Sequence, residues 1–520
     1  MVVLPGLDKR IIDAIDDKSV TERVKLDIRS DFILAPHFNA FFVAAHADLW
    51  SRLSESLKAG TYNPDLPLTI SVPKERWFIR PGSILQPFDR FLYQALIDGV
   101  ADRLEQGMDR TRSFSHVVSD EPNQMLVPAH QCWERFQGKV TQLCDLGTHV
   151  LRADIANYFE RIPQHHLVNL MSAAGCPPES VKLVEEMLLA FQERDSFGIV
   201  QGLFPSDILG NFFLSDFDAF CELHNIPSAR YVDDIYLAFD SESAARRGLI
   251  QLIESLRKDG LHLNEYKSGI FPADEIIREE TAIDRLFEEV RQEIDDEMRP
   301  GVVSPYAFEA DWEFDDDPPD EALDEEEITA LAAERVFGQI GEYPKYADRI
   351  ERFCLPLLHR ADSDVAVDYV LAHLLRKPHQ TRLYFSYLTG FVRDNPALVR
   401  TLERYFQSHE LISGFQRMFL LATLMRASQI DRRAVNGAIQ WLQNRQIAKE
   451  ARAMAAIFAS RHGNPNQKRA VRLEYENEPS DYVRSAILYA ARYFTGVEKR
   501  TCKRAWGGHN EINALIATTI

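Results

Sequence analysis

The sequence predicts an α+β protein in three parts: a mixed helix-and-strand region over residues 1–280, a charged segment over 281–330 and an all-helical region over 331–520. Short β-prone runs interrupted by Pro and Gly predict strands in the first part. The second part begins as a charged helix, and its residues 309–327 contain twelve acidic residues and no Lys or Arg, which predicts a solvated linker. A chain of 520 residues is also too long for one ordinary core, so two or three domains are expected.

The last part is predicted to be helical because apolar residues recur there at intervals of three and four. In the segment DYVRSAILYAARYF these residues form one face, and Ser480 stands at the N-cap position. Gly463 is expected at the C′ position of a preceding helix. Leu421 and Phe458 are 37 residues apart, and Phe458 and Phe494 are 36 residues apart. This period predicts helix pairs stacked as a short HEAT-like α-solenoid, with a non-repetitive helical bundle as the alternative.

The composition is that of a soluble globular protein, with 45% hydrophobic and 27% charged residues. No run of eighteen apolar residues occurs, which argues against a membrane span, and the first residues lack the layout of a secretory signal. The six cysteines are scattered without a CxxC pair, so neither structural disulfides nor a zinc site is expected. Together these features predict a protein of a reducing cytoplasm.

Net charge decides little about the partner. The formal net charge is −20, which at first argues against nucleic acid. Without residues 309–327, however, the other 501 residues carry only −8. Because salt limits the reach of a charge to roughly 8–10 Å, this mild acidity does not exclude a local basic groove.

Three aspartates stand in strand-like surroundings and are the first candidates for a catalytic site. Asp233 and Asp234 interrupt the apolar run SARYVDDIYLAF, and Asp154 lies in HVLRADIANYFERIP. Neighbouring carboxylates inside a strand repel each other and are costly to desolvate unless a cation neutralises them. Hard divalent cations such as Mg²⁺ prefer carboxylate oxygens, and two such ions about 3.5–4 Å apart can catalyse phosphoryl transfer. The alternative is that the adjacent aspartates mark a hairpin turn with both side chains in water.

These segments resemble the motifs of reverse transcriptases. YVDD resembles motif C, and the segment around Asp154 resembles motif A. The segment GIVQGLFPSDILGNFFL resembles motif B, although Pro205 stands one place later than in the family pattern. The positions that fit motif B are Gln201, Gly202, Ser206, Leu209 and Asn211.

Two further segments resemble the same family. GLHLNEYKSGIF resembles motif D through Leu263, Asn264 and Lys267. A segment that resembles the fingers matches at Lys74, Arg80, Pro81, Arg90 and Gln94. The resemblance covers roughly residues 55–271, and it implies the fingers and palm of a right-hand polymerase in the first part of the chain. No motif E or typical thumb is recognised.

The resemblance implies a metal site with two Mg²⁺ ions, for which Mn²⁺ is an alternative. Asp154 and Asp233 would be its ligands, with the backbone carbonyl of Ile155 completing one of the two sites. Asp234 would be a further catalytic ligand or would only tune the site. These ions would activate an attacking 3′-hydroxyl and stabilise the leaving pyrophosphate.

The resemblance also implies contacts to an incoming deoxynucleoside triphosphate. The residues concerned are Lys74, Arg80, Phe159, Gln201, Gly202 and Lys267. Lys74 and Arg80 would hold the triphosphate, and Gln201 would contact the nucleotide. Gly202 would let the backbone approach closely, and Lys267 would protonate the leaving pyrophosphate. Phe159 would act as a steric gate that clashes with a 2′-hydroxyl, although by its sequence context alone it would be a core residue.

The layout, a palm followed by an acidic linker and helical repeats, resembles the abortive-infection reverse transcriptases of bacterial anti-phage systems. That resemblance implies a homo-oligomer in the bacterial cytoplasm that makes DNA without a template. It also implies priming from a protein hydroxyl, so that the DNA product stays covalently bound to the enzyme. Many hydroxyls qualify, Tyr62 and Tyr306 among them, and the sequence does not choose a priming residue.

Two other functions stay open at this stage. One is a templated reverse transcriptase that copies a dedicated RNA through a basic groove with aromatic stacking. The other is a polymerase-derived scaffold without chemistry, whose helical repeats bind partners. The presence of all three aspartates together with Gln201, Lys74 and Arg80 argues against the scaffold.

Overall fold

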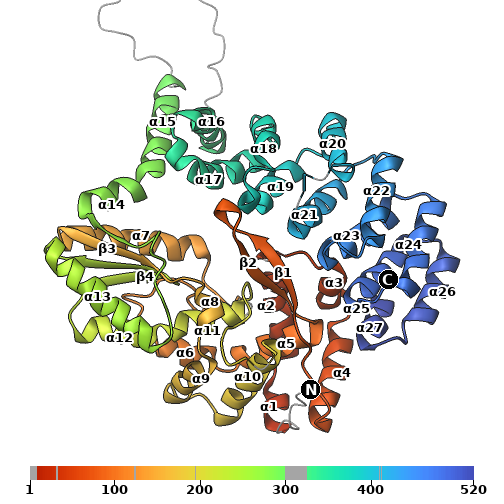
Figure 1. The fold of residues 1–520 in the computed structure, drawn as a ribbon, viewed down its shortest axis with the longest axis horizontal. Helices are drawn as coiled ribbons and strands as arrows, with labels where there is room; N and C mark the ends of the chain where they lie inside the picture. Colours follow the sequence, from red (N-terminus) through yellow and green to blue (C-terminus); the bar gives the residue numbers. More distant parts are fainter. Residues whose placement is uncertain are drawn as a thin grey trace, which may run out of the picture.

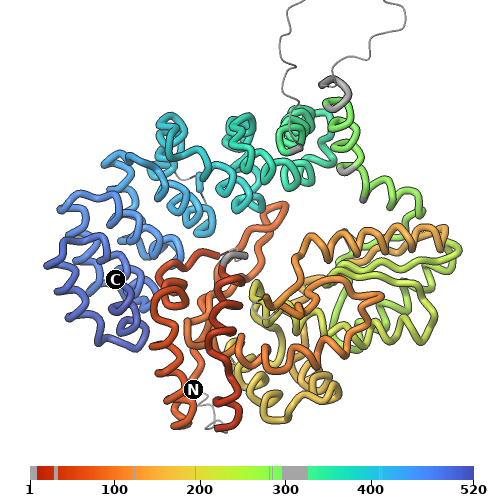
Figure 2. The backbone as a smooth tube through the Cα atoms, turned by 180° about the vertical axis from the view of Figure 1, so that it is seen from behind, coloured from red at the N-terminus to blue at the C-terminus, as the bar shows by residue number. Residues whose placement is uncertain are grey.

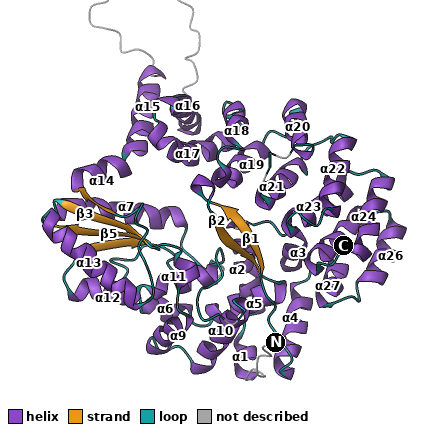
Figure 3. Ribbon diagram, in the orientation of Figure 1, coloured by secondary structure: helices purple, strands orange, loops and turns teal. Residues whose placement is uncertain are grey.

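The computed structural model describes residues 9–30, 33–121, 124–193, 195–298, 325–408, 410–411 and 413–520. It confirms the predicted α+β class: a four-stranded sheet and a separate hairpin lie in the first half, and the rest is helical (Figures 1 and 3). Tyr306 and the acidic stretch 309–324 lie outside the described residues. The last three acidic positions, Glu325 to Glu327, begin helix α16. All six cysteines are buried and free.

The N-terminal part consists of helices around a two-stranded hairpin. Its helices are α1 (Lys9–Ala14), α2 (Asp17–Ser30), α3 (Pro36–Ala44), α4 (His46–Ala59), α5 (Pro87–Asp98) and α6 (Ala101–Gln106). The next helix, α7 (Ala129–Leu146), packs instead against the four-stranded sheet. The hairpin pairs β1 (Leu68–Pro73) with β2 (Ile79–Ile84) in antiparallel register, so that Val72 stands opposite Arg80. Its tip is a short 3₁₀ turn, η1 (Glu75–Trp77).

The palm is built on an antiparallel sheet with the strand order β4-β5-β3-β6. The strands are β3 (His149–Asp154), β4 (Ser228–Tyr231), β5 (Asp234–Phe239) and β6 (Gly269–Pro272). The helices of this region are α8 (Tyr158–Arg161), α9 (Gln164–Ala173), α10 (Pro178–Phe191), α11 (Phe204–Phe213), α12 (Ser215–Leu223), α13 (Glu242–Lys258) and α14 (Ala273–Glu280).

Alternation along the strands gives this sheet two buried faces. On β5, Tyr236 and Ala238 pack into a small core with α7 and α14, whereas Ile235 and Leu237 pack into the main core together with Leu252 of α13. Helices therefore cover both faces (Figure 1), and the chemistry of the palm can only be presented at an end of the sheet.

The remaining helices form an arc that runs from the palm back to the N-terminal helices (Figures 1 and 2). They are α15 (Ala282–Met298), α16 (Glu325–Gly338), α17 (Ala347–Arg360), α18 (Val367–His373), α19 (Thr381–Thr389), α20 (Pro396–Glu403), α21 (Gly414–Leu424), α22 (Arg432–Gln443), α23 (Lys449–His462), α24 (Pro465–Asn477), α25 (Asp481–Ala490), α26 (Gly496–Trp506) and α27 (Glu511–Thr519). From α21 onward, alternate helices pack on one another in an inner layer (α21, α23, α25, α27) and an outer layer (α22, α24, α26). The HEAT-like assignment stays a prediction.

Two details of the helical prediction need correction. Gly463 caps α23 but has φ −75°, so it is not the left-handed C′ residue that we expected. A glycine is required there by close packing, because a Cβ would lie 2.3 Å from the carbonyl oxygen of Ala459. Ser480 is the N-cap residue of α25, as predicted, but its side chain makes no capping hydrogen bond, and the helix ends at Ala490 and continues as a 3₁₀ turn.

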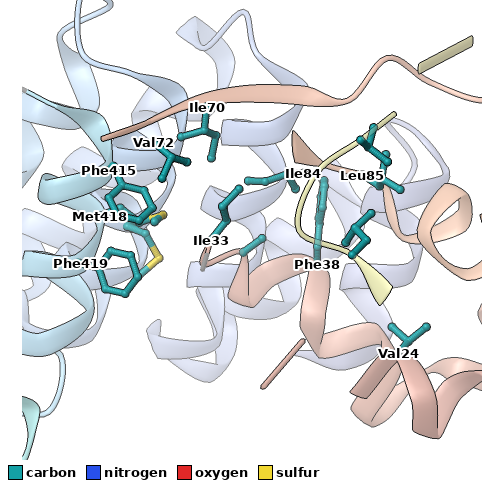
Figure 4. Packing of buried hydrophobic residues seen from close by; sticks show 14 of the residues in the cluster. Val24, Ile33, Phe38, Ile70, Val72, Ile84, Leu85, Phe415, Met418 and Phe419 are labelled. Carbon is teal, nitrogen blue, oxygen red and sulfur yellow. The ribbon is translucent and has the colours of Figure 1, made fainter. Parts of the chain in front are cut away.

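The arc closes on the first part of the chain at two places. Ile70 and Val72 of the hairpin pack near Phe415, Met418 and Phe419 of α21 (Figure 4). Helix α3 packs against α25 and α27, with the buried ring of His37 beside Phe38 and the ring of Tyr482. The hairpin is thereby joined to the helical region.

The His37 contact predicts an acid sensitivity of this closure. Burial lowers the pKa of His37 to about 3, whereas an unfolded histidine titrates near 6.5. The unfolded chain therefore takes up a proton that the folded protein does not, so the free energy of unfolding falls as pH drops below about 6.5. Between pH 7 and pH 5 the free energy of unfolding of His37→Phe should fall by about 2 kcal/mol less than that of the wild type, as measured by urea unfolding. The exposed His130 is the control: a His130→Gln variant that suppressed the loss equally would contradict the assignment to His37.

Candidate active site

The adjacent aspartates lie at a hairpin turn and not inside a strand, which corrects the strand prediction. Strand β4 ends at Tyr231 and β5 begins at Asp234, with Tyr231 paired to Asp234, so Val232 and Asp233 form the turn. Val232 has φ +57°, a left-handed conformation that is strained for a β-branched residue. The alternative with both side chains in water is also only half right, because Asp234 is exposed but Asp233 is half-buried.

The sheet register brings all three aspartates to one end of the palm. Asp154 is the last residue of β3 and stands directly opposite Asp234 in the β3–β5 pairing. Burial raises the pKa of Asp233 to about 7, and the nearby Asp234 and Asp154 carboxylates add to the shift. A half-buried carboxyl group beside two others is what a hard divalent cation would neutralise, so the donor set fits Mg²⁺ or Mn²⁺.

Motif D lies beside Asp154. The Asn264 N–H donates to the Asp154 carbonyl over 2.7 Å, and the Ser268 hydroxyl accepts from the Asp154 N–H over 3.1 Å. Ile155 is buried and forms an isolated β-bridge with Leu263. Lys267 reaches into the cluster, with its Nζ 3.1 Å from Asp154 Oδ1. Although burial opposes the charged form, the Asp154 carboxylate raises the pKa of Lys267 above its ordinary value.

This ion pair predicts a competition between Lys267 and a divalent cation for Asp154. We expect Lys267→Met to bind Mn²⁺ about two- to fivefold more tightly than the wild type in the absence of nucleotide, a modest gain because exposed ion pairs are screened. Titration followed by electron paramagnetic resonance measures it. Lys258→Met, which removes an exposed charge at the end of α13, should leave the affinity unchanged. Weaker Mn²⁺ binding by Lys267→Met would show that Lys267 supports the metal site.

The structure separates the two cations predicted to hold the triphosphate. Arg80 of β2 is close enough to Asp233 to feel its charge; burial lowers the pKa of Arg80, and the Asp233 carboxylate acts in the opposite direction. Lys74 follows β1 at the tip of the hairpin. Within the part of the chain that the structure describes, its side chain makes no hydrogen bond or ion pair with the aspartates. Lys74 and Arg80 therefore lie at different levels of the same hairpin, since Arg80 pairs with Val72.

Motif B forms the loop before α11 and the first turns of that helix. Gly202 has φ +90°, a conformation that side-chain-bearing residues rarely adopt, and Gln201 beside it is half-buried. The displaced Pro205 lies in the first turn of α11, where no backbone N–H is needed. Its late position is therefore compatible with the helix. Asn211 is fully buried and bonds to Ser115 and Arg230, contacts that the motif alone does not reveal.

Phe159 lies on the short helix α8 with 9% of its surface exposed, and its ring packs against α11. A Cβ at Gly210 would stand 2.8 Å from the Phe159 ring, so any larger residue there would have to displace the ring. The Tyr158 hydroxyl donates to the Gly210 carbonyl over 2.5 Å and fixes the two helices together. Tyr62, one of the hydroxyls considered for priming, is buried and bonded to the Asp89 carboxylate.

A second group of ligand-type side chains lies away from the palm. Among the described residues, Glu75, Asp348 and His379 are the group whose ligand atoms all lie within 4.8 Å of one another. Lys377 Nζ is 2.7 Å from Asp348 Oδ1, and His379 Nε2 is 2.8 Å from Asp348 Oδ2. The cation of Lys377 already pairs with Asp348, so the cluster resembles a salt bridge between α17 and the segment 377–379 more than a metal site.

The buried residues behind the turn were not predicted from the sequence. Arg230 is 1% exposed and Asp218 and Ser115 are equally inaccessible. An arginine directly before YVDD, within a strand of small and apolar residues, was a signal of a buried charge that needs a partner.

Comparison with known proteins identifies the family of the palm. Residues 79–284 match the family model described as reverse transcriptase (RNA-dependent DNA polymerase). A search of curated protein sequences gives no significant match.

Two solved structures are similar over much of the chain. A telomerase from Candida albicans, in complex with a fragment of telomeric RNA, covers 73% of this chain and 70% of its own at 10% identity and a TM-score of 0.31. An apo telomerase from Candida tropicalis covers 91% of this chain and 74% of its own at 10% identity and a TM-score of 0.29. No helix in the described parts of the chain is long and apolar enough to cross a membrane. The matched segment, residues 79–284, contains the three aspartates and every other predicted site residue except Lys74, and it is a reverse transcriptase domain.

Proposed function

We propose that this protein is a nucleotidyltransferase that polymerises deoxynucleoside triphosphates at Asp154, Asp233 and Asp234. The observation that carries the proposal is the meeting of these carboxylates at one end of the palm, where burial raises the pKa of Asp233 to about 7. A structural carboxylate would be paired or solvated, whereas Asp233 is half-buried beside two further carboxylates at a reachable edge of the sheet, with Lys267 paired to Asp154 and Arg80 nearby. Two bound Mg²⁺ or Mn²⁺ ions would supply activation of the 3′-hydroxyl and stabilisation of the leaving pyrophosphate.

The surrounding residues support roles in binding the nucleotide. Arg80 lies within reach of the Asp233 charge, where its guanidinium would meet phosphate oxygens, and Lys74 would join it from the hairpin tip. Lys267, already beside Asp154, would donate a proton to the leaving group. Gln201 and Gly202 would contact the nucleotide from the loop before α11.

The kind of polymerase is a further part of the proposal. We place the protein among the abortive-infection enzymes of bacteria, as a cytoplasmic homo-oligomer that makes untemplated, protein-primed DNA. In support, the chain passes from β6 and α14 directly into α15 and the helical arc. The second candidate is templated synthesis on an RNA, which the description of the matched family as RNA-dependent favours. A scaffold without chemistry would not need three carboxylates at one sheet end.

The test uses the purified protein with Mg²⁺ and labelled deoxynucleotides, without template or primer, resolved on a denaturing gel. Label that migrates with the protein and shifts after proteinase treatment supports the protein-primed polymerase. Label that appears only after RNA is added supports templated synthesis and overturns the abortive-infection assignment. No incorporation under either condition, by a protein that still binds Mn²⁺, would leave the scaffold.

A further inference from the structure

The strained turn that carries Asp233 is held in place by a hydrogen bond to one buried hydroxyl group. The N–H of Val232 donates to Ser115 Oγ over 2.8 Å. Ser115 is fully buried and belongs to the loop after α6, far from β4 in the sequence. Since Val232 adopts φ +57° without being glycine, this contact compensates for an unfavourable backbone conformation.

Ser115 is the end of a buried chain of hydrogen bonds. Its hydroxyl donates to Asn211 Oδ1 over 3.0 Å, and its carbonyl accepts from Asn211 Nδ2 over 2.7 Å. Arg230 donates to the same Asn211 Oδ1 over 2.6 Å and to the Asn211 carbonyl over 2.9 Å. The guanidinium also forms a forked pair with Asp218, with contacts of 2.7 to 3.0 Å.

Stability alone does not explain this arrangement. Removing an ion pair such as Arg230–Asp218 from water costs about as much as the pair returns, and apolar residues of similar volume often serve as well. What the network supplies is position, because it connects α12, α11 and the Ser115 loop to the turn between β4 and β5. We propose that Asp218, Arg230, Asn211 and Ser115 are positioning residues that hold the Val232 turn so that Asp233 faces Asp154. This inference rests on the proposed polymerase function.

The sharpest test is Ser115→Ala, because it removes the acceptor for Val232 and leaves the Arg230 contacts in place. We expect the variant to fold, to bind Mn²⁺ about tenfold more weakly and to lose kcat while the KM for deoxynucleotides stays unchanged. The matched control is Ser113→Ala: the Ser113 hydroxyl is equally buried and donates to the same Asn211 Oδ1 over 3.0 Å but does not touch the turn. It should keep wild-type Mn²⁺ affinity, and Ser115→Thr, which keeps the hydroxyl, should restore most of the loss.

Mn²⁺ binding is measured without turnover, so this inference and the proposed function can fail separately. Wild-type Mn²⁺ affinity and kcat in Ser115→Ala would overturn the positioning role while leaving the polymerase intact. An equal loss in Ser113→Ala would reduce the network to general stability and would also overturn it. A wild-type protein that neither binds Mn²⁺ nor incorporates nucleotides would overturn both.

A second, independent inference comes from the charge of the helical region. Residues 331–520 contain 28 Lys and Arg against 18 Asp and Glu, a net charge of +10 in a chain whose total is −20. In the C-terminal part three acidic side chains are buried, those of Glu450, Glu474 and Glu478, and Arg445 pairs with the last two. The exposed acidic residues over 425–520 are Asp431, Glu476, Asp481 and Glu511. The exposed basic residues over the same span are Arg426, Arg432, Arg433, Arg445, Lys449, Arg461, Arg469, Arg492, Arg500 and Arg504.

Half of these cations lie on the outer layer of helices. They are Arg432 and Arg433 on α22, Arg469 on α24, and Arg500 and Arg504 on α26. The three helices are joined side by side, because Gln467 of α24 donates to the Arg432 carbonyl and Arg472 of α24 pairs with Glu498 of α26. Figures 1 and 2 both show them at the outer edge of the arc, away from the palm.

Arginine forms bidentate bonds with phosphate, and repeated arginines on one face are typical of surfaces that bind a polyanion. A protein that is acidic elsewhere would concentrate such a ligand on this layer. We infer that the outer layer of α22, α24 and α26 binds the phosphate backbone of a nucleic acid. This surface would keep a template or product close to the enzyme without reading its sequence.

Fluorescence anisotropy with labelled single-stranded DNA, single-stranded RNA and duplex DNA, in EDTA and without nucleotides, tests this inference. We expect the triple variant Arg469→Glu, Arg500→Glu, Arg504→Glu to weaken binding at least tenfold and to lower the salt slope by about 2. The control reverses three exposed charges on α13, Arg247, Arg257 and Lys258, and should bind like the wild type. An unchanged affinity and slope, an equal loss in the control, or binding to anionic lipid vesicles but to no oligonucleotide would overturn it.

Discussion

Asp233→Asn is expected to abolish nucleotide incorporation and, without metal, to make the protein more stable at pH 8. Burial and the two neighbouring carboxylates raise the pKa of Asp233 to about 7, whereas an unfolded aspartate titrates near 3.9. The folded protein therefore keeps a proton that the unfolded chain has lost, so stability falls as pH rises from about 4 through 7. Above pH 7 the loss is complete, and the neutral amide avoids it. The gain is on the order of 2–4 kcal/mol.

Thermal unfolding in EDTA at pH 5.5 and pH 8 measures this effect, and a second series with Mg²⁺ separates the role of the metal. Between pH 5.5 and pH 8 the wild type should lose about 2 kcal/mol of stability relative to Asp233→Asn, and Mg²⁺ should offset that relative loss in the wild type. The comparison of the two proteins cancels the opposite pH dependence of groups such as His37, which both contain. Asp234→Asn is the control for charge alone, because Asp234 is exposed and its removal should change stability less. An Asp233→Asn variant that incorporates nucleotides would contradict the metal-ligand assignment. One that is less stable than the wild type at pH 8 would contradict the electrostatic argument.

The three aspartates could be singled out as candidates from the sequence because they stand among β-prone residues and two of them are adjacent. Desolvating neighbouring carboxylates costs free energy unless a cation neutralises them, and this cost does not depend on where each strand ends. The turn could not be predicted in the same way. YVDD contains none of the Gly or Asn residues that usually occupy a two-residue hairpin turn, and Val232 is among the residues least suited to φ > 0. The conformation depends on Ser115, more than a hundred residues away, so it belongs to tertiary structure.

The helical region shows a similar limit. The spacing of apolar residues predicted helices because it depends on one helix at a time. It could not predict that α3 packs against α25 and α27, which places His37 beside Tyr482. The charge of the surface could not be predicted either, because a net charge of −20 does not tell which charged side chains are exposed. Only the fold shows that Glu474 and Glu478 are buried while Arg469 and Arg500 are exposed.

Phe159→Ala is expected to admit ribonucleotides, because its ring would no longer clash with a 2′-hydroxyl. Discrimination of deoxynucleotides over ribonucleotides, measured as a ratio of kcat/KM values, should fall about 10- to 200-fold, the range that 1–3 kcal/mol of contact provides. The ring is 9% exposed and packs against Gly210, so the same change should also lower the free energy of unfolding by about 3–5 kcal/mol. A loss of stability is therefore expected whether Phe159 selects the sugar or only fills the core. A loss of discrimination is expected only if it selects the sugar.

Two variants separate these effects. Phe212→Ala removes an equally large ring, 2% exposed, from α11 itself, and it should cost similar stability without admitting ribonucleotides. Gly210→Ala should push the Phe159 ring toward the nucleotide, since the new Cβ would lie 2.8 Å from it, and should lower kcat/KM for deoxynucleotides. Adding Phe159→Leu should relieve that clash and restore part of the activity, because the two residues are in contact and their effects are not additive. If Phe159→Ala excludes ribonucleotides as strictly as the wild type, the ring serves the core and another group selects the sugar.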